Sequence, residues 1–80
     1  MIVAVLGAGT MGHGIAHAAV AAGYDVRLYD VSETALAGAR TNIQRIFQKA
    51  IDLGKGSTAE ADAAIRRLSL TTDLGVALDA

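Results

Sequence analysis

The first third of the chain passes from a short apolar run to an alanine-rich stretch and back. Residues 2–6, Ile-Val-Ala-Val-Leu, are continuously apolar and end at Gly7. Such a run predicts a strand buried on both faces, as in parallel sheets. Residues 10–22, mostly Ala, predict a closely packed helix ending before Gly23, and residues 26–30 predict a second strand. Strand, helix and strand within about thirty residues match one parallel crossover unit.

The middle of the chain carries apolar residues at helical spacing. Leu, Ile, Ala and Phe recur at intervals of three and four over residues 36–51, with Arg, Lys and Gln mainly on other faces. Ser32 is placed to cap the start of this helix, and Glu33 lies at the positive end of its dipole. The pattern predicts one long helix over residues 33–53, ended by the Gly-Lys-Gly sequence of residues 54–56.

The last third predicts two further helices and a strand. Residues 57–60, Ser-Thr-Ala-Glu, match a capping box, so a helix should cover residues 58–67. Residues 68–71 can form a third strand, and residues 73–78 a short helical turn. The order βαβααβ therefore predicts an open α/β sheet.

Composition excludes several classes of protein. The 80 residues carry a formal charge of −1, and 52% of them are apolar, which is too apolar and too weakly charged for a disordered chain. Without cysteine the chain has no disulfide scaffold and no cysteine zinc site. Because basic clusters are absent, we expect no nucleic-acid partner and no membrane-surface partner. The longest uncharged run is interrupted by glycines and histidines, so we expect no transmembrane segment and a cytoplasmic protein.

The link between the first strand and the first helix is rich in glycine. Residues 7–12 read Gly-Ala-Gly-Thr-Met-Gly, and Asp30 closes the second strand 18 residues after Gly12. This G-x-G-x-x-G pattern is a weak signal alone, but here it follows a strand, opens a helix and lies inside a βαβ unit. That combination is the dinucleotide-binding fingerprint. We therefore expect an α/β fold, the first half of a Rossmann-type doubly wound parallel sheet, with residues 1–80 forming a partial dinucleotide-binding domain and no second domain.

The residue types in this pattern have chemical reasons. Gly7 permits a tight turn where a Cβ would clash, Gly9 lets the backbone approach a pyrophosphate, and Gly12 lets the helix pack on the strands. The unpaired N–H groups and the dipole at the helix start attract an anion. Asp30 can accept hydrogen bonds from ribose hydroxyls and would repel a 2′-phosphate, and the next two residues supply no cation. We predict NAD rather than NADP, bound by Gly7, Ala8, Gly9, Thr10, Met11, Gly12 and Asp30.

Other positions have plainer interpretations. His13 and His17 are spaced to share a metal ion, but no third ligand lies near them, so we expect two polar helix positions and no metal site. Ile46 and Phe47 should belong to the core. Lys55 could meet an anionic substrate, although a solvated loop is the simpler interpretation. Further basic side chains are most simply solvated helix faces: Arg45, Lys49, Arg66 and Arg67.

Several segments, in their order along the chain, resemble a known family. The loop Gly-Ala-Gly-Thr-Met-Gly followed by Gly-Ile-Ala is similar to the N-terminus of bacterial 3-hydroxyacyl-CoA dehydrogenases. His17 stands where that family usually has Gln. The resemblance covers essentially the whole chain and is carried by residues 3–12, 14–16, 22–26, 28–30, 54–55 and 70–74.

This resemblance implies oxidation of a 3-hydroxyacyl-CoA to the 3-ketoacyl-CoA, with hydride transfer to NAD. The family's catalytic His and Glu lie downstream of the region matched, so no catalytic residue is assigned and we expect the chain alone to be inactive. The acyl-CoA would be bound largely through the missing domain. The family's long helix and following loop lie near the CoA, which makes Lys55 the candidate substrate contact. We expect the isolated chain to bind NAD with a dissociation constant on the order of 0.1–1 mM.

A doubly wound sheet has the strand order 3-2-1-4, which would place strand Ile2–Leu6 in the centre. The chain ends at Ala80, before the fourth strand. The first strand then becomes a flat, apolar edge, which favours association. We expect self-association, or a complementing chain, at the Ile2–Leu6 edge.

Two alternatives remain open from the sequence. A fragment of a 2-hydroxyacid-type dehydrogenase would have a similar loop, but such enzymes pass more directly from the second strand to the third. A non-catalytic nucleotide-binding or assembly module would bind NAD without belonging to an enzyme.

Overall fold

Three parallel strands and four helices make up the part of the chain that the computed structural model describes, residues 2–79 apart from the side chains of Thr10 and Met11. Each element matches a predicted one, with ends that differ by one residue at most. The elements are β1 (Ile2–Leu6), α1 (Thr10–Ala21), β2 (Asp25–Tyr29), α2 (Glu33–Asp52), α3 (Thr58–Arg66), β3 (Leu68–Thr71) and α4 (Leu74–Leu78).

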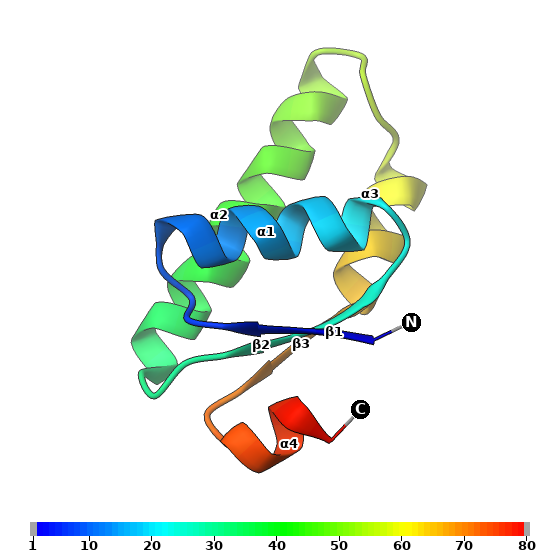
Figure 1. The fold of residues 1–80 in the computed structure, drawn as a ribbon. Helices are drawn as coiled ribbons and strands as arrows, with labels where there is room; N and C mark the ends of the chain where they lie inside the picture. Colours follow the sequence, from blue (N-terminus) through cyan, green and yellow to red (C-terminus); the bar gives the residue numbers. More distant parts are fainter. Residues whose placement is uncertain (1, 80) are drawn as a thin grey trace.

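The sheet has the order β1-β2-β3, and both strand pairs are parallel. Helices α1, α2 and α3 lie on one face of the sheet, and α4 lies on the other (Figure 1). Because α1 joins β1 to β2 and the α2–α3 pair joins β2 to β3, each connection crosses the same face. This arrangement confirms the predicted α/β fold.

The core lies between the sheet and the three helices. Side chains that alternate along each strand reach this face, where Val5 pairs in register with Leu28, and Leu28 with Leu70. Small residues on α1, such as Ala16, let that helix approach the strands closely, and Ile43 of α2 is fully buried. The buried cluster consists of Val5, Ala8, Ala16, Val20, Val26, Leu28, Leu36, Ala39, Ile43, Ala64 and Leu68.

The opposite face of the sheet is covered more thinly. Leu6 is 58% exposed and Ala4 is also exposed, so the prediction that this strand is buried on both faces is wrong. The physical reason is that β1 lies at the edge of the sheet and α4 covers only part of its lower face. Arg27 reaches from this face toward α4, where its Nη1 donates a hydrogen bond to the Val76 carbonyl at 3.1 Å.

Helix ends follow the signals read from the sequence. The Ser32 hydroxyl accepts a hydrogen bond from the Ala35 N–H at 3.1 Å, and the Ser57 hydroxyl accepts one from the Glu60 N–H at 3.1 Å. Gly23 has a φ of +97°, the left-handed conformation that ends α1. Ser32 and Ser57 therefore fix where α2 and α3 begin, and Gly23 fixes where α1 ends.

Candidate cofactor site

The glycine loop turns the chain sharply from β1 into α1. Gly7 has a φ of +103°, and its N–H donates a hydrogen bond to the Tyr29 carbonyl at 2.7 Å. A Cβ at Gly7 would meet no atom within 4 Å, so the left-handed backbone, rather than the expected clash, is what requires glycine there. A Cβ at Gly12 would overlap the Gly7 carbonyl oxygen, which shows how closely the first turn of α1 lies against the end of β1.

Helix α1 begins without a side-chain cap. Gly9 is its N-cap residue, and its first turn carries no acidic side chain. The first N–H groups of a helix have no partner within the helix, and the dipole concentrates positive charge there. A Cβ at Gly9 would meet no atom within 4 Å, so space is open in front of these groups. A shallow hollow of about 440 Å³ runs from here along the edge of β1, lined by Gly7, Gly9, Gly12 and Ile15 among others.

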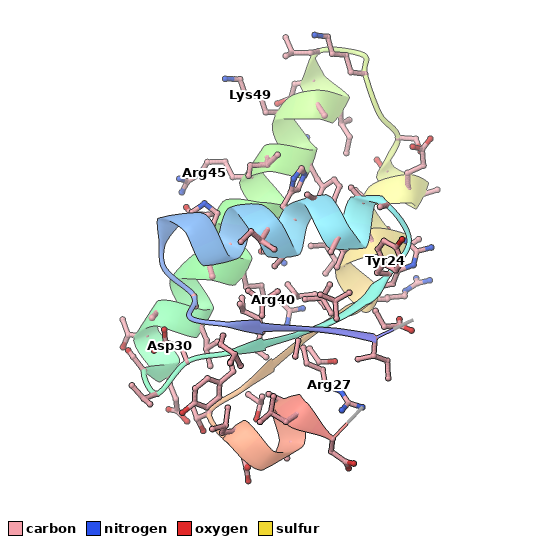
Figure 2. The ribbon with its side chains drawn as sticks, in the orientation of Figure 1. Tyr24, Arg27, Asp30, Arg40, Arg45 and Lys49 are labelled. Carbon is pink, nitrogen blue, oxygen red and sulfur yellow. The ribbon has the colours of Figure 1, made fainter. Side chains whose placement is uncertain are left out.

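Asp30 follows β2 directly and lies at the same edge of the sheet as the start of α1 (Figure 2). Its Oδ2 accepts a hydrogen bond from the Ala8 N–H at 3.0 Å, and its Oδ1 accepts one from the Ser32 N–H at 2.8 Å. These two bonds, with that from Ala8 the larger influence, hold the pKa of the Asp30 carboxyl below its usual value. The carboxylate is therefore charged at neutral pH.

The structure brings most of the predicted cofactor residues together. Gly7, Ala8, Gly9, Gly12 and Asp30 meet at the carboxyl edge of β1 and β2. The two residues between Gly9 and Gly12 open α1, and their side chains lie outside the described part of the chain.

Sequence reasoning missed the bond between Ala8 and Asp30. The signal for it is the parallel register: because Leu6 pairs with Tyr29, the residues just beyond both strands are adjacent.

The two histidines of α1 face different partners. His13 Nδ1 lies 3.2 Å from the Gly9 carbonyl oxygen, whereas the His17 ring lies 4.7 Å from the Phe47 ring of α2. Burial lowers the pKa of His17, and the charge of His13 lowers it further. Within residues 2–79, leaving aside the undescribed side chains, no group of three or more His, Cys, Asp or Glu is placed to hold a metal ion.

Lys55 belongs to the loop between α2 and α3, and this loop lies at the opposite end of α2 from the glycine loop (Figure 1). There, α1, α2, α3 and the loop after α2 enclose a groove of about 370 Å³, with Lys55, Phe47, His17 and Arg67 among its lining residues.

Two interpretations made from the sequence are wrong in this groove. Ile46 is 39% exposed and lines the groove, because α2 extends beyond the sheet. Arg67 is half-buried, and its Nη1 donates to the Val20 carbonyl at 3.4 Å.

A parallel βαβ unit with an uncapped helix start beside a charged carboxylate defines a dinucleotide-binding protein of the Rossmann type. The family model described as "3-hydroxyacyl-CoA dehydrogenase, NAD binding domain" matches residues 2–80. The chain therefore belongs to the 3-hydroxyacyl-CoA dehydrogenase family, and the matched residues belong to its NAD-binding domain. This membership confirms NAD as the cofactor and decides against a 2-hydroxyacid-type dehydrogenase.

Curated relatives and solved structures agree with the family match. The chain is 38% identical over 72 residues to a 3-hydroxybutyryl-CoA dehydrogenase of Mycobacterium tuberculosis, covering 90% of this chain and 25% of the relative. It is 39% identical over 72 residues to the 3-hydroxyadipyl-CoA dehydrogenase of Escherichia coli, covering 90% of this chain and 15% of the relative. The crystal structure of an E. coli 3-hydroxybutyryl-CoA dehydrogenase superposes with a TM-score of 0.95 at 36% identity, covering 100% of this chain and 17% of that one.

The chain thus spans a quarter or less of the length of these relatives. In the region that the structure describes, no helix combines the length and the apolar character needed to cross a membrane.

Proposed function

We propose that residues 7–12 and Asp30 hold the ADP half of NAD. The observation that carries this proposal is that the uncapped start of α1 lies next to the Asp30 carboxylate. Ala8, which precedes that start, donates its N–H to Asp30 Oδ2 at 3.0 Å. A ligand that fits has an anionic pyrophosphate adjacent to a ribose diol. The N–H groups at the start of α1 face the pyrophosphate, while Gly9, which has no side chain and open space around it, allows its close approach.

The same carboxylate favours NAD over NADP. A 2′-phosphate would lie against the charged Asp30, and the next residues along the chain, Val31 and Ser32, offer no cation. Discrimination of roughly tenfold or more follows from one unfavourable charge contact at a partly exposed position.

An NMR titration of the chain with NAD and with NADP tests this site. Saturable amide shifts at Gly7, Gly9, Gly12 and Asp30 are expected with NAD, with a dissociation constant on the order of 0.1–1 mM. NADP should produce smaller shifts at equal concentration. The amides of α3, more distant from the loop, are the internal control. A well-dispersed spectrum that does not respond to NAD would contradict the proposal.

We propose that these residues are the first part of the dinucleotide-binding domain of an enzyme that oxidises a 3-hydroxyacyl-CoA to a 3-ketoacyl-CoA. The proposal is supported by the family match and by the names of the relatives, which are 3-hydroxybutyryl-CoA and 3-hydroxyadipyl-CoA dehydrogenases. The chain spans a quarter or less of these relatives, and no catalytic residue is assigned within it, so the chain alone should show no turnover. NAD reduction with 3-hydroxybutyryl-CoA, measured by absorbance for the chain and for a protein that continues it, tests both statements.

Lys55 is our proposed contact for an anionic part of the acyl-CoA. Its groove has apolar walls, including Phe47, and its charged lining side chains are Lys55, Arg67 and Glu60, a net positive set. Titration with CoA should shift amides of this groove, and Lys55→Ala should weaken the effect several-fold, the loss of one charge contact. Lys49→Ala, an exposed lysine on α2, is the matched control. Equal titrations for the two variants would remove Lys55 from the proposal.

We propose that the outer edge of β1 pairs with a further strand, from a continuation of the protein or from another copy. The edge is flanked by apolar side chains, with Leu6 58% and Ile15 53% exposed beside the hollow along β1. The chain by itself should associate at rising concentration in analytical ultracentrifugation, and Ile15→Lys should reduce this association. Ile46→Lys, on the far end of α2, is the control. A monomer at all concentrations would contradict this proposal.

We also propose a cytoplasmic location, because NAD and acyl-CoA are metabolites of the cell interior. Fractionation of cells expressing a tagged protein tests it, and recovery in the membrane or the medium would oppose it.

A further inference from the structure

Asp30 is engaged by the protein before any ligand arrives. Its Oδ2 accepts from Ala8 and its Oδ1 from Ser32, at 3.0 and 2.8 Å. An ionised carboxylate offers about four acceptor positions on its two oxygens. Two are occupied by the backbone, and two remain for the two hydroxyl groups of a ribose. Asp30 can therefore bind a ribose diol without releasing either backbone N–H.

The bond to Ala8 is one of two that attach the glycine loop to β2. Gly7 donates its N–H to the backbone carbonyl of Tyr29, and Ala8, the next residue, donates its own to the Asp30 side chain. Ala8 is 4% exposed, so its amide lies where a lost partner is not simply replaced by water. Of these two attachments, only that to Asp30 depends on the identity of a side chain.

Gly9, which begins α1, follows Ala8 directly. Its backbone is extended at ψ −169°, and a Cβ there would meet no atom within 4 Å. The His13 ring at its carbonyl belongs to α1 itself, so it does not fix Gly9 relative to β2. The direction of the N–H groups at the start of α1 is therefore set from its two flanks. These are the contact of Gly12 with Gly7 on one side and the Ala8 bond to Asp30 on the other.

We propose that Asp30 is a positioning residue for the glycine loop in addition to being an acceptor for the ribose. By holding the Ala8 N–H, it sets the place of Gly9 and the start of α1, so that pyrophosphate binding depends on a carboxylate that the pyrophosphate does not contact. This inference rests on the proposed NAD site. One consequence is that replacing Asp30 so that the site accepts NADP also weakens binding of the pyrophosphate at the start of α1.

Inorganic pyrophosphate separates this role from ribose binding, since it has no ribose. In Asp30→Asn the single amide oxygen cannot serve both N–H groups as the carboxylate does. Charge alone predicts that this variant binds pyrophosphate more tightly, because a negative group has been removed. Loss of the hydrogen bond that holds the glycine loop predicts weaker pyrophosphate binding instead. We expect the dissociation constant for pyrophosphate, from amide shifts of Gly9 and Gly12, to rise roughly threefold to tenfold, as for one lost hydrogen bond to a charged group.

Asp25→Asn is the matched control, because it removes the same charge from the exposed start of the same strand. Its pyrophosphate affinity should be unchanged or slightly higher. Unchanged or tighter pyrophosphate binding by Asp30→Asn would overturn the positioning role and leave the ribose role intact. Failure of the unmodified chain to bind either NAD or pyrophosphate would instead remove the proposed cofactor site, and this inference with it.

A second measurement needs no variant and covers the case in which Asp30→Asn does not fold. The amide protons of Ala8 and Ser32 should shift with the same midpoint as the Asp30 carboxyl carbon when the unmodified chain is titrated with acid. The Gly7 amide, which donates to a backbone carbonyl, should shift less. An Ala8 amide that ignores the Asp30 titration would overturn the inference.

Discussion

Helices α1 and α2 begin side by side at the carboxyl edge of the same sheet, yet their first turns differ. The start of α2 is closed by its own residues: the Ser32 hydroxyl accepts from Ala35, and Glu33 lies in the first turn. The start of α1 has Gly9 as its N-cap, with no side-chain acceptor and no acidic residue. A capped start stabilises the fold, whereas an uncapped start leaves donors for a ligand. The contrast shows that this chain gives up helix stability at the position where the pyrophosphate is proposed to bind.

Asp30 lies between the two helix starts and contacts the segment leading into each. One oxygen accepts from Ala8, ahead of α1, and the other from Ser32, the cap of α2. The open and the closed start are thus attached to a single carboxylate. Changes at one start should therefore be compared with matched changes at the other.

The largest expected effect comes from Gly12→Ala. The added methyl group would overlap the Gly7 carbonyl oxygen, which is backbone and cannot rotate away. The first turn of α1 must then move off β1, at a cost of at least about 3 kcal/mol of unfolding free energy, the upper range of overpacking. NAD binding should become undetectable. Urea unfolding followed by circular dichroism, and the NAD titration, measure the two effects.

Gly14→Ala is the control for this change, because a Cβ at Gly14 would meet no atom within 4 Å. It should gain up to about 1 kcal/mol, the helix-propensity difference between alanine and glycine. Equal stability of the Gly12 and Gly14 variants would show that the loop does not need this close contact.

Gly9→Asp would turn the open start of α1 into a closed one. The Gly9 backbone has a negative φ of −68° and free space around it, so the side chain fits without strain. The new carboxylate should cap the helix and stabilise the chain by a few tenths of a kcal/mol, while it blocks and repels the pyrophosphate. NAD affinity should fall at least about tenfold, or ~1.4 kcal/mol. Thermal unfolding and NAD titration should thus move in opposite directions.

Gly38→Asp is the control, since it adds the same charge at an exposed, open position of α2. It should raise stability slightly, because aspartate has a somewhat higher helix propensity than glycine, and it should leave NAD affinity unchanged. If Gly9→Asp bound NAD normally, the uncapped start of α1 would not be the pyrophosphate site.

Ser32→Ala is the reverse experiment at α2. It removes the hydroxyl that accepts from Ala35 but keeps the Ser32 N–H that Asp30 uses. The expected cost is about 1 kcal/mol of unfolding free energy, typical of a lost N-cap, with NAD affinity within about twofold. Ser57→Ala, at the start of α3, should cost a similar amount. A large loss of NAD binding in the Ser32 variant alone would mean that the cap of α2 also shapes the cofactor site.

The elements could largely be predicted from the sequence, and so could the meeting of the glycine loop with Asp30, because both depend on local signals. Apolar runs, Ser32, Ser57 and the positive φ of Gly23 act over a few residues, and the fingerprint spacing places Asp30 near the loop. What could not be predicted depends on which surfaces are covered. The strand Ile2–Leu6 has a fully apolar pattern yet exposes Leu6, since no pattern within the strand reports how far α4 extends over it.

The smallest expected effect concerns His17, which lies on α1 beyond the cofactor loop and packs its ring on Phe47. Burial holds its pKa below the ordinary 6.5. The unfolded chain therefore binds more protons just below pH 6.5, so stability should fall as the pH drops from 6.5 to the folded pKa of His17. His17→Gln should make the stability nearly constant over this pH range. The loss of stability below pH 3.8 should remain, because the lowered pKa of Asp30 also makes stability fall as the pH drops. His13→Gln should flatten the same part of the profile only in part, because it removes the smaller of the two causes that lower the pKa of His17. Unfolding midpoints from pH 3 to 8 measure both, and identical profiles for native and His17→Gln chains would show that this histidine is not desolvated.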